Sequence, residues 1–164
     1  MNRRYFIPFV LLAVLIINCT SVIAASECSR AVLKETADKY LDALKKGSSS
    51  VMPLASQAKY IENRKEIPFS DGIWKSPLSI DFSRSLLDVD TCQSFTEIIH
   101  ANGSHPYVIG TRLKVEDGRI SEVESLVSDE DDWLFNATDY LKYSSTEKWD
   151  ILPADKRMER NALI

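Results

Sequence analysis

Three side chains in the second half of the sequence could take part in proton transfer or anion binding: His100, Arg112 and Glu124. Abstracting a proton from carbon beside a carbonyl group requires a base that titrates near neutral pH and a donor that stabilises the enolate oxygen. Histidine titrates in that range, and a carboxylate among apolar residues can be tuned to do so. We therefore take His100 and Glu124 as candidate catalytic residues. Arg112, whose planar fork suits a carboxylate, is a candidate substrate-binding residue.

Each of these residues also has a simpler interpretation. His100 ends an apolar run beside a turn, where a histidine at the surface is common. Arg112 could be an exposed residue that pairs with Glu97 or Glu122 on a neighbouring strand. Glu122 and Glu124 could be ordinary solvated charges of a strand. The sequence alone leaves both interpretations open.

The first half of the sequence adds Tyr60 as a candidate catalytic residue, and Asn63 and Trp74 as candidate substrate-binding residues. Tyr60 and Trp74 could equally be core aromatics with a polar atom, and Asn63 could be a turn residue. The sequence contains no glycine-rich phosphate loop, nucleophile elbow or set of metal-ligand spacings. We therefore expect any chemistry to need no cofactor and no metal.

The elements that would position these residues are one long helix and several strands. Apolar spacing predicts a helix over residues 31–46, with Ser29 as its N-cap and Gly47 as its stop. Residues 51–55 fit a further helical turn or a tight connection, and residues 78–90 fit a short helix or an irregular crossing.

The remaining periodic segments predict strands. Residues 59–62 form a short strand-like run, and residues 92–101, 107–116 and 119–128 predict an antiparallel meander. The turn Asp117-Gly118 joins the last two strands of this meander. A last turn of helix is predicted within residues 133–143.

The first 25 residues have the order of a secretory signal: Asn2-Arg3-Arg4, an apolar run over residues 5–17, and small residues up to Ser26. The apolar run of about thirteen residues is shorter than the ~20 that a spanning helix needs. We predict a cleaved signal peptide at residues 1–25, a secreted or secretory-lumen protein, and no stable membrane span after cleavage. Without Arg3 and Arg4, 18 basic residues face 24 acidic ones, and this net charge of −6 argues against nucleic acid as a partner.

Two cysteines, Cys28 and Cys92, remain once Cys19 leaves with the signal peptide. In an oxidising compartment an even pair predicts one disulfide. The sequences Asn102-Gly103-Ser104 and Asn136-Ala137-Thr138 are N-glycosylation acceptors that suit the same compartment.

Several of these motifs occur together in a known superfamily. Tyr60-x-Glu62-Asn63, Gly72-x-Trp74 and the hairpin over residues 113–124 make residues 28–127 resemble the nuclear-transport-factor-2-like superfamily, which includes ketosteroid isomerases and SnoaL-like cyclases. The signal peptide and the paired cysteines are similar to a fungal secreted group of SnoaL-like domains. Size and layout are similar to the dimerising cyclases of maleidride pathways.

The resemblance implies an α+β cone, in which a curved antiparallel sheet is wrapped around an N-terminal helix and encloses a pocket. It divides the chain into the signal peptide, a SnoaL-like domain at residues 26–132 and a C-terminal extension at residues 133–164. It implies a cofactor-independent isomerase or cyclase of fungal secondary-metabolite biosynthesis, most concretely one that dimerises maleidride (anhydride) monomers. The partner would be a small apolar or anionic metabolite, and the protein could form a homodimer.

The alternative is a secreted, non-catalytic module that binds a small molecule in the same kind of cavity. A buried titratable group with a shifted pKa beside a donor would favour the enzyme. A cavity whose lining is apolar would favour binding without turnover.

Overall fold

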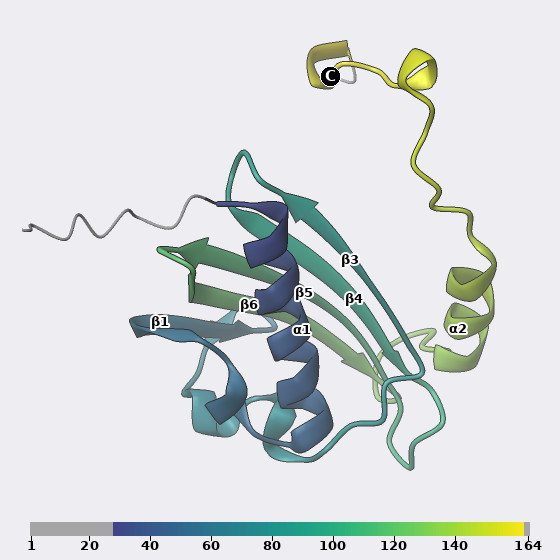
Figure 1. Ribbon diagram of the computed structural model, residues 1–164. Helices are drawn as coiled ribbons and strands as arrows, with labels where there is room; N and C mark the ends of the chain where they lie inside the picture. Colours follow the sequence, from purple (N-terminus) through teal and green to yellow (C-terminus); the bar gives the residue numbers. More distant parts are fainter. Residues whose placement is uncertain (1–27, 163–164) are drawn as a thin grey trace, which may run out of the picture.

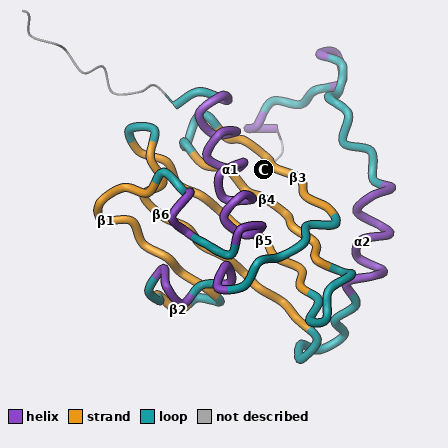
Figure 2. The backbone as a smooth tube through the Cα atoms, turned by 60° about the horizontal axis from the view of Figure 1, so that its bottom comes forward, coloured by secondary structure: helices purple, strands orange, loops and turns teal. Residues whose placement is uncertain are grey.

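The computed structural model describes residues 28–162, so the predicted signal peptide at residues 1–25 lies outside the described residues. Helix α1 (Arg30–Lys46) lies across one face of a six-stranded sheet, and α2 (Ala137–Thr146) lies beside β3 and β4 (Figures 1 and 2). The strands are β1 (Leu54–Glu62), β2 (Lys65–Glu66), β3 (Phe82–Asp88), β4 (Gln93–His100), β5 (Tyr107–Glu116) and β6 (Arg119–Asp129).

Helix α1 forms where the apolar spacing predicted it, and its two ends are capped as expected. The Ser29 hydroxyl accepts a hydrogen bond from the backbone N–H of Val32 at 3.2 Å. At the other end Gly47 adopts φ 66°, the left-handed conformation that glycine tolerates without a steric cost, and its N–H reaches the last carbonyls of the helix. A Cβ at Gly47 would also lie 2.8 Å from the ring of Pro77, so close packing requires glycine here as well.

The order of strands in the sheet is β2-β1-β6-β5-β4-β3. Strands β4, β5 and β6 pair antiparallel, as the predicted meander requires, and β3 adds a further antiparallel strand beside β4. However, β1 pairs with β6 in parallel, and the register of this pair shifts between Leu54 and Lys59. The expected nuclear-transport-factor-2-like cone of antiparallel strands is therefore wrong: the protein is α+β, but its sheet is mixed and carries two helices.

Two segments differ from the sequence-based expectation for identifiable reasons. Residues 54–62 form one nine-residue strand instead of the predicted strand over residues 59–62. The strand is longer because β6 provides a parallel partner, which the local sequence pattern does not indicate. Residues 82–88 form the edge strand β3, which pairs with β4 from Phe82↔Ile99 to Asp88↔Gln93. This strand has no clean alternation of buried and exposed residues, so periodicity could not identify it.

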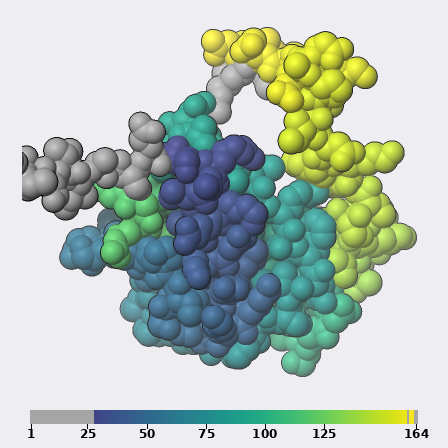
Figure 3. All heavy atoms as spheres, viewed as in Figure 1, coloured from purple at the N-terminus to yellow at the C-terminus, as the bar shows by residue number. Residues whose placement is uncertain are grey.

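We call the sheet face that packs on α1 the inner face, and the opposite face the outer face. The inner face is closely packed: Leu33, Tyr40 and Leu44 of α1 are fully buried, as are Ile109 and Leu113 of β5. In the space-filling view the side chains of α1 close over this face of the sheet (Figure 3). The main helix and the sheet are therefore held together by a solid apolar core.

A small polar group lies within that core. The hydroxyl of Tyr40 lies 2.8 Å from the hydroxyl of Thr111, which lies 2.9 Å from the hydroxyl of Ser125. All three side chains are fully buried, so each needs a partner inside the protein. Burial raises the pKa of Tyr40 to about 12. This trio fixes the rotation of α1 against β5 and β6.

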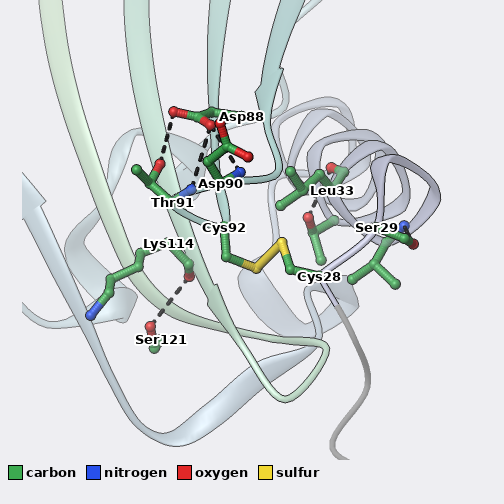
Figure 4. The surroundings of a disulfide bond; sticks show 11 residues. Cys28, Ser29, Leu33, Asp88, Asp90, Thr91, Cys92, Lys114 and Ser121 are labelled. Carbon is green, nitrogen blue, oxygen red and sulfur yellow. Dashed lines mark hydrogen bonds between the residues drawn. A yellow bond between two sulfur atoms is a disulfide. The ribbon is translucent and has the colours of Figure 1, made fainter.

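The predicted disulfide is present. Cys28 and Cys92 are joined across a sequence separation of 64 residues, with 5.6 Å between their Cα atoms. Figure 4 shows that the bond connects the segment before α1 to the turn between β3 and β4. Cys92 adopts φ 53°, and the Asp88 carboxylate accepts hydrogen bonds from Asp90 and Thr91 in the same turn. The bond thus links the start of the main helix to the β3 side of the sheet.

Helix α2 begins at Ala137, four residues later than the predicted segment 133–143, and ends at Thr146. Its N-cap is Asn136, whose side-chain oxygen accepts a hydrogen bond from the N–H of Asp139 at 3.0 Å. Among residues 28–162, neither helix combines the length and the apolar character that crossing a membrane requires.

Candidate functional site

The structure distributes the six predicted site residues over three places: Tyr60 and Trp74 in the core, Asn63 and His100 at strand ends, and Arg112 and Glu124 on the outer face. Arg112 and Glu124 lie in direct contact on neighbouring strands. Tyr60 of β1 contacts Trp74, which lies in the short helical turn Ile73–Lys75. The two pairs occupy opposite faces of the sheet. The structure therefore does not bring all six candidate residues together at one place.

Tyr60 and Trp74 are core residues whose polar atoms are satisfied within the protein. Only 1% of Tyr60 and 2% of Trp74 is exposed, and their ring centroids lie 4.4 Å apart. The Tyr60 hydroxyl donates to a Glu62 carboxylate oxygen, which also accepts the N–H of Ile73 at 3.0 Å. Trp74 donates its indole N–H to the carbonyl of Phe69 at 2.6 Å.

Glu62 is the residue of this cluster that sequence reasoning did not propose for a role. Burial, together with the hydrogen bond to Glu62, raises the pKa of the Tyr60 phenol well above its usual value. The phenol is therefore a neutral, buried donor, and it is directed at a carboxylate of the same strand. The tyrosine-x-glutamate spacing could have indicated that Tyr60 and Glu62 contact each other, because alternate residues of a strand share a face.

Asn63 has a structural position at the end of β1. Its backbone has φ 49° and that of Arg64 has φ 67°, two positive values in succession as a type I′ turn between β1 and β2 requires. The Asn63 side chain donates to the carbonyl of Val127 at 3.1 Å and accepts from the N–H of Val127 at 2.8 Å. Both functions of its amide are therefore used in joining β1 to β6.

His100 lies at the end of β4 and is 7% exposed. Its Nδ1 lies 2.5 Å from the carbonyl oxygen of Ser79, and a carbonyl can only accept. Nδ1 therefore carries the hydrogen in the neutral ring, and Nε2 is the basic nitrogen. Gly103 packs against Nε2, because a Cβ at this glycine would lie 1.9 Å from that atom. His100, His105 and Tyr107 line a hollow of about 380 Å³ at this end of the sheet.

Arg112 and Glu124 lie on the outer face within a network of paired charges. The Arg112 guanidinium donates from Nε and Nη2 to one oxygen of Glu124, at 3.0 and 2.7 Å, and from Nη2 to Glu122. Its Nη1 donates to the side-chain oxygen of Gln93 at 3.2 Å. The pairing with Glu122, one of the two simpler interpretations of this arginine, is thus observed. All three nitrogens of the guanidinium already have acceptors.

An apolar cleft of about 470 Å³ lies beside Arg112, at the turn between β3 and β4. Leu86 and Phe95 line it, and they face each other across the β3–β4 pair with 47% and 46% of their surfaces exposed. Phe95 rests over Gly110 of β5, where an added Cβ would lie 3.0 Å from the tip of the phenyl ring. The absence of a side chain at Gly110 therefore leaves the space that the Phe95 ring occupies on the sheet.

A second hollow of about 240 Å³ continues from this cleft toward α2, and it shares Leu86 and Phe95 with the first. Tyr140 of α2 and Trp149 of the following segment form its far side. We call the two hollows together the outer-face groove. Its lining residues are Leu86, Leu87, Val89, Phe95, Val108, Gly110, Tyr140 and Trp149, with Asp88, Asp90, Thr91, Gln93, Ser94, Arg84, Glu97, Ile109 and Arg112.

A second arginine network stands at the α2 end of the groove. Arg84 donates to Glu97 at 2.6 Å and to Glu147 at 2.9 Å, and its guanidinium carbon lies 4.1 Å from the ring centroid of Trp149. The Trp149 indole N–H donates to Glu147 at 2.9 Å. This network holds the segment after α2 against β3 and so forms one wall of the groove.

The groove can hold an apolar molecule, but its charged groups are engaged with one another. Arg112 donates from all three of its nitrogens, so it has no free donor fork for an anionic substrate. Arg84 contacts the carboxylates of Glu97 and Glu147 through Nη2. Within residues 28–162, histidine, cysteine and acidic side chains form no group of three that could hold a metal ion. Leu86, Phe95 and Gly110 were not among the predicted site residues, because an apolar residue on a strand does not reveal which face meets the core.

These features define a small, disulfide-bridged α+β domain with an apolar groove on the sheet face opposite its main helix. The chain belongs to the family described as Domain of unknown function (DUF8021), whose family model matches residues 26–127.

Comparison with solved structures gives a similar protein from Methylobium petroleophilum PM1, described as a protein of unknown function with a cystatin-like fold. The two chains are 16% identical, the TM-score is 0.49, and the match covers 77% of this chain and 98% of the other. None of the curated proteins compared with this chain matches it.

Proposed function

We propose that this protein is a secreted binding module that holds a small, largely apolar molecule in the outer-face groove. The observation that carries the proposal is the pair Leu86 and Phe95. Two large apolar side chains, each about half exposed, flank a cleft of about 470 Å³. Sites for small molecules commonly have volumes of about 300–1,000 Å³ and a mainly apolar lining with a few polar groups.

The state of the polar groups supports binding without turnover. In the groove, Arg112 and Arg84 are bonded to carboxylates, and in the core the Tyr60 phenol is bonded to Glu62. A catalytic base or acid needs an atom that can reach the substrate, and these groups already have partners inside the protein. The Cys28–Cys92 bond supports an oxidising compartment, in keeping with secretion.

Titration with the neutral fluorescent probe N-phenyl-1-naphthylamine tests the proposal. The probe should bind the wild-type protein with a gain in fluorescence, and Phe95→Ser should weaken binding about tenfold, because it removes the largest apolar side chain of the cleft. Leu126→Ser is the matched control, since Leu126 is 57% exposed on β6 and lies outside the groove lining. Equal affinity of the wild-type protein and the Phe95→Ser variant would reject the groove as the binding site.

A second candidate function is favoured by one observation, the orientation of His100. With its Nδ1–H donated to the Ser79 carbonyl, the basic Nε2 belongs to a side chain that lines the 380 Å³ hollow. This arrangement suits a cofactor-independent isomerase or cyclase, including one that acts on maleidride-type anhydrides. Deuterium uptake into the methyl groups of 2,3-dimethylmaleic anhydride in D2O would test it. The exchange should be lost in His100→Ala and kept in His105→Ala, and a rate equal to that of buffer would reject this function.

A further inference from the structure

We infer that the ligand of the outer-face groove carries a positive charge, as an amine attached to an apolar body. The inference rests on the proposed binding function and specifies the chemical class of its ligand. It follows from the charges around the groove and from the hydrogen-bonding capacity that remains there.

Negative charge exceeds positive charge in both arginine networks. Arg112 lies between Glu122 and Glu124, and Arg84 lies between Glu97 and Glu147, so each network has a net charge of −1. Lys114 of β5 lies opposite Glu122 and is paired with Glu116 at 2.7 Å. Because Lys114 and Glu116 together add no net charge, the Arg112 network that includes them keeps a net charge of −1. A cationic group beside the cleft would therefore be attracted, and an anionic group repelled.

The remaining hydrogen-bonding capacity has the same preference. The three nitrogens of Arg112 are bonded to Glu122, Glu124 and Gln93, so an incoming carboxylate would have to displace one of these partners and would lie beside two carboxylates. In the described part of the chain, the second oxygen of Glu122 and that of Glu124 accept no hydrogen bond. The two side chains are 26% and 38% exposed, so an ammonium group can reach these oxygens. On this inference Arg112 holds the two glutamates in place, instead of acting as the predicted clamp for an anionic metabolite.

A second copy of the chain is a poorer occupant of the groove. In a symmetric dimer the same surface meets itself, so the acidic networks of the two copies would face each other. The whole chain has a net charge of −4, which adds to this repulsion. A small cationic amphiphile matches the groove better, because its apolar part can fill the cleft and its positive charge can lie beside the acidic networks.

Two dansyl probes that differ in charge test the inference. Dansylcadaverine carries an amine, and N-dansyl-6-aminohexanoic acid carries a carboxylate on a chain of similar length. We expect dansylcadaverine to bind about tenfold more tightly at low salt, and the preference to shrink as NaCl is added. The double variant Glu122→Gln and Glu124→Gln should abolish the preference, because it removes both charges and keeps the acceptors for Arg112. Glu66→Gln should retain it, since Glu66 is exposed on β2, at the edge of the sheet opposite β3.

The neutral probe separates failure of this inference from failure of the proposed function. If N-phenyl-1-naphthylamine binds at the groove and the two dansyl probes bind equally, or the acidic probe binds better, the positive charge is rejected and the binding module stands. If no probe binds and sedimentation shows a stable dimer that Phe95→Asp dissociates, a second copy occupies the groove and both proposals are overturned. A preference that persists at high salt or in the double variant also contradicts the inference.

Discussion

Removal of the Cys28–Cys92 bond should destabilise the whole domain rather than only the start of α1. The bond closes a loop with a sequence separation of 64 residues, which includes α1, β1, β2 and β3. In the chain-entropy description, a cross-link across a loop of this length raises the free energy of the unfolded chain by about 4 kcal/mol. For a domain of this size that corresponds to a loss of about 15 °C in melting temperature.

The double variant Cys28→Ser and Cys92→Ser measures this change without leaving a free thiol. Urea unfolding, followed by circular dichroism at several temperatures, gives the free energy of unfolding of the oxidised protein and of the variant. The variant should keep the native near-ultraviolet spectrum, because α1 also contacts the sheet through Leu33, Tyr40 and Leu44.

A matched control exploits the backbone at position 92. Cys92 has φ 53°, a conformation that costs about 1 kcal/mol for a residue with a Cβ. Cys28→Ser with Cys92→Gly should therefore recover part of the loss, by about 1 kcal/mol relative to the double serine variant. If glycine gives no recovery, the turn itself changes when the bond is absent.

Hydrogen exchange distinguishes a global effect from a local one. If the cross-link acts on the unfolded chain, every slowly exchanging amide of β4, β5 and β6 should lose the same protection in the double serine variant. A loss confined to the first turns of α1, or a change in unfolding free energy below about 1 kcal/mol, would refute the reasoning. Either result would mean that the bond only fastens the helix terminus.

Three further predictions concern titratable and closely packed groups. Burial raises the pKa of Tyr40 to about 12, while the unfolded value is 10. The free energy of unfolding should therefore fall by about 1.4 kcal/mol per pH unit between pH 10 and pH 12, and urea unfolding should show a smaller decline in Tyr40→Phe. Gly103→Ala should destabilise the protein by about 2 kcal/mol, because its Cβ would overlap His100, and a double-mutant cycle with His100→Ala should show coupling. The hydrogen bond to Asp129 raises the pKa of His105, although burial opposes this shift. NMR titration should therefore give a pKa above 6.5 for His105, and this pKa should fall in Asp129→Asn. The stabilisation that the pair provides should disappear as the pH rises through the pKa of His105.

The elements that the sequence predicted well are those whose signals are local. Helix α1 appears within one residue of its predicted start because apolar spacing, the Ser29 cap and the Gly47 stop all lie in one short segment. Strands β4, β5 and β6 follow their alternating patterns, and Asp117 and Gly118 both adopt the positive φ that their turn requires. These features need no information from distant parts of the chain.

The elements that were missed depend on distant partners. Strand β1 extends to Leu54 because it lies parallel to β6, more than sixty residues away. Strand β3 exists because β4 offers it a full row of partners, although its own burial pattern is irregular. Parallel pairing through a long connection leaves no short-range mark in a sequence, so the antiparallel cone was the wrong extrapolation.

The candidate site shows the same division. The cysteine count determined the disulfide, because two cysteines left in an oxidising compartment have one pairing available. Alternation along β5 correctly separated Arg112 from Leu113, and it offered Glu122 as a partner for the arginine. Alternation cannot state which face of a sheet meets the helix.

By itself, then, the sequence determined the main helix, the meander, the cross-link and the sets of residues that share a strand face. Only the tertiary structure decided that α1 covers the face with Thr111 and Ser125, which leaves Arg112, Glu124 and Phe95 on the other. The physical reason is that the alternation of a strand sorts its residues into two faces but does not show which face is buried. The packing of a helix over one of them decides which becomes core and which can hold a ligand.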